Sequence, residues 1–412
     1  MRFHIHKPSL IDALKVNYAI YLCVFLACLV PRYISALKLH IGIDISYYTI
    51  TVVLFWLLFT RRVVINKKIE CVFFYIWLLY IFLSVWRAEN IGIWFFYLNW
   101  ILTAILFQQI LIRYRDESTY EFIVKALTDS LFVHLLMGLY EITAHTYLFE
   151  VGNVARTSYG HVAIGIFHNL NDYSTFVTTM IPFAIYRFLS SYKITEKLYS
   201  LFLAITSLYL IILNGSRGAI LTLMIFVLAG IVMFAKKSNK NKLIISGIIC
   251  VFGVLLVFNI GNSSTFLFNL ISSNTVDTNY SSDIARINLI RNGLYFLKKT
   301  YGFGVGAGNL YSWLAEKSIY NIGNLRFIHN WYVEVLVTFG VLFFVIYIFF
   351  HGKLLYKLFS KKYGTSQLKT TLFLSFVCFS VVSISSSSNI YSEWVWMYLV
   401  VISLFSESLE KK

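Results

Sequence analysis

The sequence predicts an all-α membrane protein that crosses the bilayer many times, and three features of its composition support this fold class. Hydrophobic residues make up 58% of the 412 positions, charged residues only 13%, and the mean hydropathy is +0.72. A soluble globular protein carries about 25% charged residues. Apolar runs close to the ~20 residues that a spanning helix requires recur along the whole chain. We therefore expect one integral membrane domain over residues 1–412.

Twelve apolar runs are the candidate transmembrane helices, and polar or charged residues separate them. They cover residues 17–35, 44–60, 70–86, 91–112, 121–142, 172–189, 198–213, 218–235, 243–260, 330–350, 371–389 and 393–409. The first run lacks a small-residue cleavage site, and further runs follow closely. It is therefore expected to span the membrane rather than to be a cleaved signal peptide.

Lysine and arginine alternate between the two sides of the predicted bundle. They concentrate in segments such as 61–68, 236–242 and 353–369, and the short segments on the other side carry almost none. The positive-inside rule places these basic segments, and both termini, in the cytoplasm. Topology and contact with anionic lipid headgroups then explain the net charge of +16, so nucleic-acid binding is not expected.

Cysteine and metal-binding patterns give no sign of a cofactor. The five cysteines all lie within apolar runs, where free cysteine behaves as a small hydrophobic residue. No two have CxxC spacing, and the histidines and carboxylates lack HExxH or similar spacing. We therefore expect neither a metal site nor a bound cofactor.

Two predicted outer segments, 143–171 and 261–328, are much longer than ordinary connections of about 4–6 residues. Loops of this length are usually functional or disordered. The second lies between the ninth and tenth runs and contains a helical pattern over 283–299.

The apolar side chains of that helical pattern form one stripe, which consists of Ile287, Ile290, Leu294 and Leu297. Arg286 and Arg291 lie on opposite edges of the stripe, so only one of them is expected to face any single site, and we favour Arg286. The alternative is an amphipathic helix on the membrane surface with both arginines at lipid headgroups.

Glycine occupies alternate positions in the segment Tyr301 to Asn309. No βαβ unit surrounds this segment and it is predicted to face outward, so it is not expected to bind a nucleotide. Its glycines are better explained by a tight turn and by close approach to a neighbouring helix or ligand.

Arg217 lies in a short polar break, Asn214 to Gly218, between two apolar runs. An unpaired cation near hydrocarbon costs on the order of 3 kcal/mol, so such an arginine is a candidate for function. The alternative is an arginine that sets topology or extends to the headgroups. The predicted topology places Arg156, Arg286 and His329 on the same side of the membrane as Arg217.

Several short elements between residues 167 and 345 form a set. They are Ser216-Arg217-Gly218-Ala219, Arg286 followed by Gly304-Val305-Gly306-Ala307-Gly308-Asn309, His329-Asn330-Trp331-Tyr332-Val333-Glu334 with Gly340, and Phe167-His168-Asn169-Leu170-Asn171-Asp172-Tyr173. This set resembles the O-antigen ligase and polymerase superfamily, which includes O-antigen ligases, Wzy-type polysaccharide polymerases and teichuronic acid biosynthesis proteins. It departs from the family pattern at Leu170 and Tyr301, where the family usually has proline.

The resemblance implies a membrane glycosyltransferase that works without a metal at the outer face of the bacterial plasma membrane. Such enzymes transfer an undecaprenyl-diphosphate-linked glycan to a sugar hydroxyl. Arginine suits a pyrophosphate because its charge is permanent and its planar group donates two hydrogen bonds. Arg217 and Arg286 are therefore the implied pyrophosphate ligands, with Arg291 as the further candidate.

The resemblance also implies that His329 is the general base, since imidazole titrates near neutral pH. Glu334 follows Asn330 by four residues, so the two are candidates to orient the base or to bind acceptor hydroxyls. An acid that simply favours the helix start explains Glu334 equally well. Arg156 and Asp172 are candidates for supporting roles. No second carboxylate pairs with Glu334 at a recognisable spacing, so a single displacement with inversion is expected.

The predicted function is a polymerase that transfers a growing lipid-linked polysaccharide onto a new lipid-linked repeat unit. A ligase that passes the same donor to another acceptor is the alternative, because nothing in the sequence specifies the acceptor. A lipid-oligosaccharide flippase or other transporter is the non-enzymatic alternative, although the two halves show no internal repeat. Expected partners are the lipid-linked oligosaccharide and the bilayer, with a flippase and a chain-length regulator as candidates.

Overall fold

The computed structural model shows a helical protein. It describes residues 10–29, 54, 69–114, 116–148, 162–167, 169–235, 282–323, 325–360, 366–386, 388–390 and 392–408. Every regular element in these ranges is a helix, as the all-α prediction requires.

The long helices supply most of the described structure. They are α1 (Leu10–Leu29), α3 (Ile69–Leu83), α4 (Ile91–Arg113), α5 (Glu117–Ala144), α6 (Leu170–Ser190), α7 (Ile194–Asn214), α8 (Arg217–Ala235), α11 (Ser282–Lys299), α13 (Trp331–Phe359), α14 (Gln367–Val382) and α15 (Glu393–Ser408), and the short helices are η2 (Val85–Arg87) and α12 (Leu310–Glu316). Within these residues, α4, α5, α7 and α13 are long and apolar enough to cross a membrane, and α1, α3, α8, α14 and α15 contain shorter apolar stretches. The chain is therefore a helical membrane protein.

The predicted spans can be compared with the structure only in part. The runs 44–60 and 243–260 lie outside the described residues, apart from Leu54. One predicted end is wrong, because the run 371–389 forms a helix only as far as Val382. Serines follow that point, and serine side chains compete for backbone hydrogen bonds and so favour turns over helix interiors. The number of spans and their orientation stay predictions.

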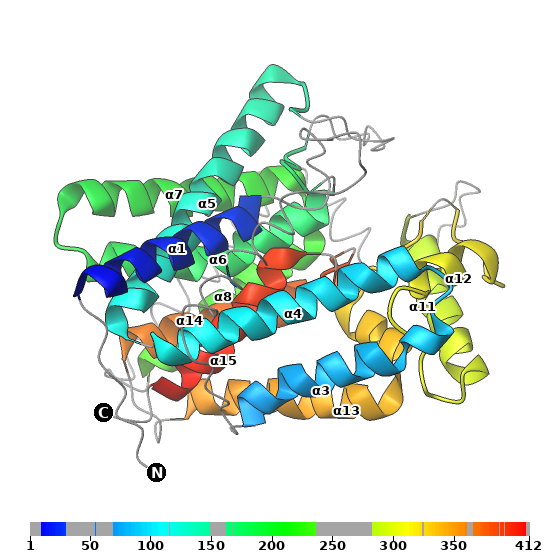
Figure 1. Ribbon diagram of the computed structural model, residues 1–412. Coiled ribbons are helices and arrows are strands. Elements are labelled where there is room, and N and C mark those ends of the chain that lie inside the picture. The colour runs from blue at the N-terminus through cyan, green and yellow to red at the C-terminus, as the bar shows by residue number, and fades with distance from the viewer. Residues whose placement is uncertain are drawn as a thin grey trace, which may run out of the picture.

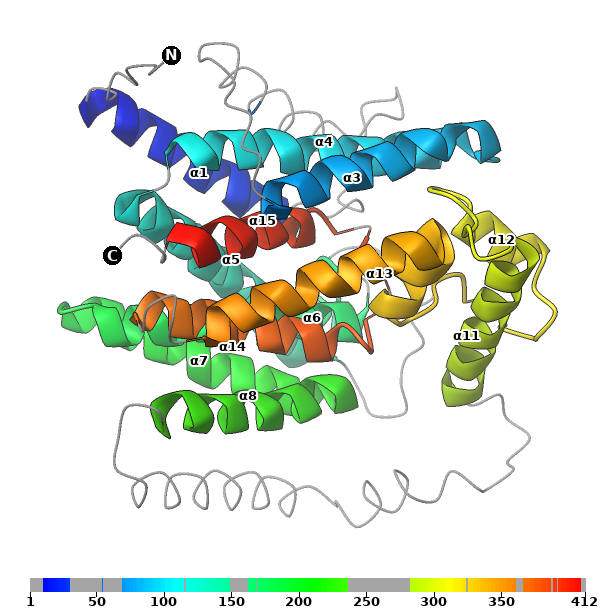
Figure 2. The same cartoon turned by 90° about the horizontal axis from the view of Figure 1, so that it is seen from below.

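Aromatic side chains fill the centre of the bundle and fix the start of α13. Trp77 on α3 lies 4.6 Å from Trp396 on α15, measured between ring centroids. Trp331, the first residue of α13, is buried and donates its indole N–H to the Tyr347 hydroxyl at 2.6 Å. Figures 1 and 2 show that α11 and α12 lie together at one end of this bundle, where α13 begins.

Helix α11 packs through a different face from the one that its apolar stripe suggested. A small outer core joins α11, α12, the glycine segment and α13, and consists of Leu289, Phe296, Val305, Leu310, Leu314, Ile322, Ile328 and Val337. Ile287 and Leu294 of the predicted stripe are instead 50% and 48% exposed. The buried face contains Asn292, whose side chain bonds the backbone of Ile319 and Tyr320. A buried asparagine whose partners lie 27 and 28 residues further along the chain leaves no apolar signal in the sequence.

The glycine segment packs backbone against backbone on a break in α13. Gly340 has φ 87° and ψ 174°, which interrupts the helix. Three hydrogen bonds cross the contact: Val305 N to Val337 O at 2.8 Å, Gly306 N to Thr338 O at 2.9 Å, and Val341 N to Gly302 O at 2.8 Å. The segment therefore replaces helical hydrogen bonds that α13 loses at its break, and this explains the close approach that its glycines permit.

We expect Gly340→Ala to destabilise the protein strongly. A Cβ at this position would lie 2.5 Å from the Gly302 carbonyl oxygen, and the left-handed φ is itself unfavourable for alanine. The two effects together are expected to cost about 3 kcal/mol or more. Thermal unfolding in detergent measures the loss. Gly352→Ala on the same helix is the control, since its Cβ meets nothing within 4 Å and alanine favours a helix, so the melting temperature should stay the same or rise slightly.

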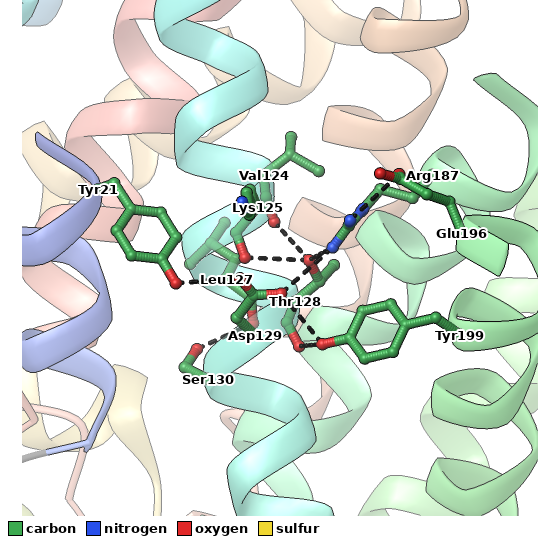
Figure 3. Close-up of polar contacts among 10 residues, drawn as sticks. All are labelled: Tyr21, Val124, Lys125, Leu127, Thr128, Asp129, Ser130, Arg187, Glu196 and Tyr199. Carbon is green, nitrogen blue, oxygen red and sulfur yellow. Dashed lines mark hydrogen bonds and ion pairs between the residues drawn. The ribbon is translucent and has the colours of Figure 1, made fainter. Parts of the chain in front are cut away.

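A polar cluster ties α1, α5, α6 and α7 together (Figure 3). Arg187, in the last turn of α6, forms ion pairs with Asp129 at 3.3 Å and Glu196 at 3.2 Å. Tyr21 and Tyr199 both donate their hydroxyls to Asp129 at 3.0 Å. The cluster therefore holds the short α6–α7 connection against α5.

Candidate functional site

Two of the candidate segments meet at the starts of α6 and α8. Ser216, directly before α8, donates its hydroxyl to the Asn171 side-chain oxygen in the first turn of α6 at 3.1 Å. Both side chains are buried. The bond joins the residue that precedes Arg217, the first residue of α8, to the residue that precedes Asp172, the acid in the first turn of α6. The positive end of a helix dipole favours an anion, so these two helix starts suit a negatively charged ligand.

The loop between α14 and α15 joins α8 to α13. Gly218 of α8 leaves no room for a side chain, because a Cβ there would lie 2.0 Å from the Ser385 hydroxyl oxygen. The backbone N–H of Trp331 donates to the Ser383 carbonyl at 3.0 Å. The same loop therefore contacts the helix that begins at Arg217 and the helix that begins two residues after His329.

His329 occupies a strained and buried position. Its φ is 55°, in the left-handed region that residues other than glycine rarely adopt, and the residue is 9% exposed. Its Nδ1 has no hydrogen-bond partner among the described residues. Burial, together with the nearby Arg286 guanidinium, lowers the pKa of His329 to about 4. The imidazole is thus neutral at pH 7 and able to accept a proton, although its pKa lies below the near-neutral value that the residue type suggested.

Glu334 lies in the first turn of α13 and is fully buried. One of its carboxylate oxygens accepts a hydrogen bond from Ser388, and the other has no partner among the described residues. Asp172 lies near enough to act on Glu334 electrostatically. The structure therefore brings a second carboxylate to Glu334, from a distant part of the sequence where spacing gave no indication of it.

The three arginines have different surroundings. Arg217 is exposed at the start of α8, and Arg286 is half-buried on α11 near His329. Arg291 is exposed and lies over the Tyr320 ring, with its guanidinium carbon 5.8 Å from the ring centroid. Arg286, rather than Arg291, therefore shares the surroundings of His329.

Of the remaining candidate residues, one caps a helix and the others lie outside the described residues. Asn330 caps α13, since its side-chain oxygen accepts from the backbone N–H groups of Tyr332 and Val333 at 3.1 Å each. This geometry gives Asn330 a part in holding the helix start. Arg156 lies outside the described residues, as does His168.

Sequence reasoning missed the α14–α15 loop. Its residues Ser383, Ser385, Ser388 and Asn389 were placed inside or beside a predicted span. Asn389 donates from its side chain to the Ser383 hydroxyl at 2.9 Å, so the loop is internally bonded as well as bonded to α13. The run of serines between two apolar stretches was the available signal, because serine side chains bond neighbouring backbone groups and so favour turns over helix interiors.

Comparison with known proteins identifies the family. The family model described as O-antigen ligase matches residues 202–348. The teichuronic acid biosynthesis protein TuaE of Bacillus subtilis (strain 168) is 30% identical over 348 residues, which cover 80% of this chain and 70% of that protein. The chain belongs to the O-antigen ligase family.

The family match and the site geometry concern the same residues. The region 202–348 that matches the O-antigen ligase family extends from α7 into α13 and contains Arg217, Arg286, Arg291, His329, Asn330 and Glu334. Asp172 and the α14–α15 loop lie outside it and reach the site only through the fold. Membership of the O-antigen ligase family makes this chain a membrane protein of polysaccharide polymerase or ligase type.

Proposed function

We propose that this protein is a polysaccharide polymerase of the extracytoplasmic face of the bacterial plasma membrane. It transfers a glycan from undecaprenyl diphosphate to a sugar hydroxyl of a lipid-linked repeat unit, with inversion and without a metal. The observation that carries the proposal is a buried, neutral His329 that lies near Arg286 and just before α13, whose start contacts the same α14–α15 loop as the start of α8 at Arg217.

The leaving group in this reaction is a lipid pyrophosphate, on which negative charge grows as the bond to the sugar breaks. Arg217 and Arg286 supply permanent positive charge for that group. Fixed cations directed at developing charge are worth several kcal/mol in the transition state. This is the role that a divalent ion has in many other glycosyl transfers.

His329 accepts the proton of the acceptor hydroxyl as its oxygen attacks the anomeric carbon. The bond between that carbon and the phosphate oxygen breaks, and the pyrophosphate leaves with the electron pair. His329 is already neutral at pH 7, and its Nδ1, which has no hydrogen-bond partner among the described residues, is an atom that can accept the proton. Glu334 and Asp172 are candidates to bind acceptor hydroxyls beside it.

Topology fixes which leaflet supplies the donor. Reporter fusions at Asn262 and Ser388 are expected to report the outside, and fusions at Asn239 and Tyr363 the cytoplasm, because basic residues concentrate beside the latter two. Paired alkaline phosphatase and fluorescent-protein fusions measure this. A cytoplasmic signal at Asn262 would place Arg286 and His329 on the wrong side for an outer-leaflet donor.

The pH dependence of turnover should reflect the lowered pKa of His329. A base must be unprotonated, so kcat/KM of the free enzyme should fall only as pH decreases toward about 4, not near 6.5. Bound pyrophosphate offsets the charge of Arg286 and raises the pKa of His329, so the acid limb of kcat should lie at higher pH than that of kcat/KM. Arg286→Gln should also shift the kcat/KM limb upward, whereas Arg291→Gln should not. If the acid limb of kcat/KM lies at the same pH in the parent, Arg286→Gln and Arg291→Gln, the assignment of His329 as the base beside Arg286 is contradicted.

Purified protein in nanodiscs, supplied with undecaprenyl-diphosphate oligosaccharide alone, tests the function directly. A polymerase produces a ladder of longer lipid-linked chains, and chelator leaves the rate unchanged. The ligase reading, which the family description favours, predicts product only after a different acceptor is added. The anomeric configuration of the new linkage tests inversion, which matters because Asp172 and Glu334 lie near one another. Donor movement across the bilayer without any product would instead indicate a flippase.

A further inference from the structure

The α14–α15 loop contacts α8 through a steric fit. Ser385 lies directly against Gly218: a Cβ on Gly218 would be 2.0 Å from the Ser385 hydroxyl oxygen and 2.8 Å from its Cβ. The Ser385 hydroxyl is in turn held by the Val382 carbonyl at the end of α14, at 3.0 Å. Gly218 directly follows Arg217 at the start of α8. The position of this helix start is therefore set by how far the loop extends toward it.

The same loop contacts α13 through hydrogen bonds. The Ser383 carbonyl accepts from the Trp331 N–H at 3.0 Å, and Ser388 donates to Glu334. Ser383, Ser388 and Trp331 are all buried. The start of α13, and with it His329, is therefore fixed to the loop at two points one helical turn apart.

We propose that the α14–α15 loop is a positioning element that sets the distance between Arg217 and His329, with Gly218 and Ser385 as its positioning residues. The proposal rests on the function proposed above, in which Arg217 holds the leaving group and His329 takes the acceptor proton. These two groups act on opposite sides of one anomeric carbon. A displacement of about 1 Å in such an arrangement costs on the order of a hundredfold in rate.

Gly218→Ala is the test, because the added methyl group forces Ser385 and α8 apart. Alanine is intrinsically better than glycine within a helix, so weaker helix formation cannot explain a loss. At saturating donor, kcat is expected to fall about a hundredfold, with donor affinity within about threefold of the parent. The double variant Gly218→Ala with Ser385→Gly removes both clashing atoms and is expected to recover most of the turnover. Gly230→Ala is the matched control on α8, since its Cβ meets nothing within 4 Å.

A second measurement needs no donor and so separates this proposal from the function. Displacement of the loop weakens the bond from Trp331 N–H to the Ser383 carbonyl. Hydrogen–deuterium exchange in peptides that cover residues 329–335 should therefore be about tenfold faster in Gly218→Ala. Exchange at the parental rate is expected in the double variant and in Gly230→Ala.

The outcomes are distinct. Exchange in Gly218→Ala at the parental rate overturns the positioning role. A double variant that exchanges as fast as Gly218→Ala and turns over as slowly also overturns it. If the parental protein shows no transfer activity but exchange at residues 329–335 is faster only in Gly218→Ala, the proposed chemistry is contradicted. The mechanical link between α8 and α13 is then still supported.

Discussion

His329→Ala is expected to lose between a hundredfold and ten-thousandfold in transfer rate while it still binds donor. The loss follows from the absence of a group that accepts the acceptor proton, and general-base catalysis is worth about that much. Donor binding should persist because the proposed mechanism assigns the pyrophosphate to Arg217 and Arg286, not to His329. Purified protein with lipid-diphosphate oligosaccharide gives both quantities: product formation measures turnover, and equilibrium binding of labelled donor measures affinity.

The strained backbone at position 329 calls for a second variant. Alanine is no better suited than histidine to φ 55°, so His329→Asn, a residue that tolerates the left-handed region, controls for a misfolded helix start. Both variants should bind donor and fail to turn over. Normal polymer formation by His329→Ala would make Glu334, buried beside Ser388, the next candidate for the base.

Arg217→Lys is expected to slow transfer roughly a hundredfold. A lysine keeps the charge but cannot make the planar, two-bond contact with a pyrophosphate, and the loss of about 3 kcal/mol of leaving-group stabilisation corresponds to that factor. Rates of polymer formation at matched protein level measure the effect.

Arg291→Lys provides the comparison for Arg217→Lys. Arg291 lies over Tyr320 at the surface of α11, and lysine retains much of that cation–π contact, so the rate should change little. If Arg217→Lys is as active as Arg291→Lys, Arg217 only sets topology or contacts lipid headgroups.

Much of the candidate site could be proposed from the sequence because its residues are chemically conspicuous in an apolar chain. Arg217 interrupts two hydrophobic runs, and His329 directly precedes another, so both stand out from composition and hydropathy alone. The helices themselves were predictable for the same reason, since backbone groups in hydrocarbon must be bonded within the segment.

The parts that escaped prediction depend on contacts between distant segments. The lowered pKa of His329 comes from burial and from Arg286 on a different helix. The approach of Asp172 to Glu334 joins the starts of α6 and α13. The buried face of α11 includes Asn292, which looks like a surface residue until its partners in the 319–320 turn are in place. Periodicity along one helix contains no information about such partners.

The break at Gly340 has a consequence for how the protein is made. Val337, Thr338 and Val341 of α13 bond the glycine segment rather than one another across the break, and unsatisfied backbone groups are costly in lipid. The glycine segment precedes α13 in the chain, so it leaves the ribosome first and is available when α13 enters the bilayer. Insertion of α13 and folding of the preceding segment are thus one coupled event, and a truncated chain that begins at α13 should insert less efficiently than one that begins at α11.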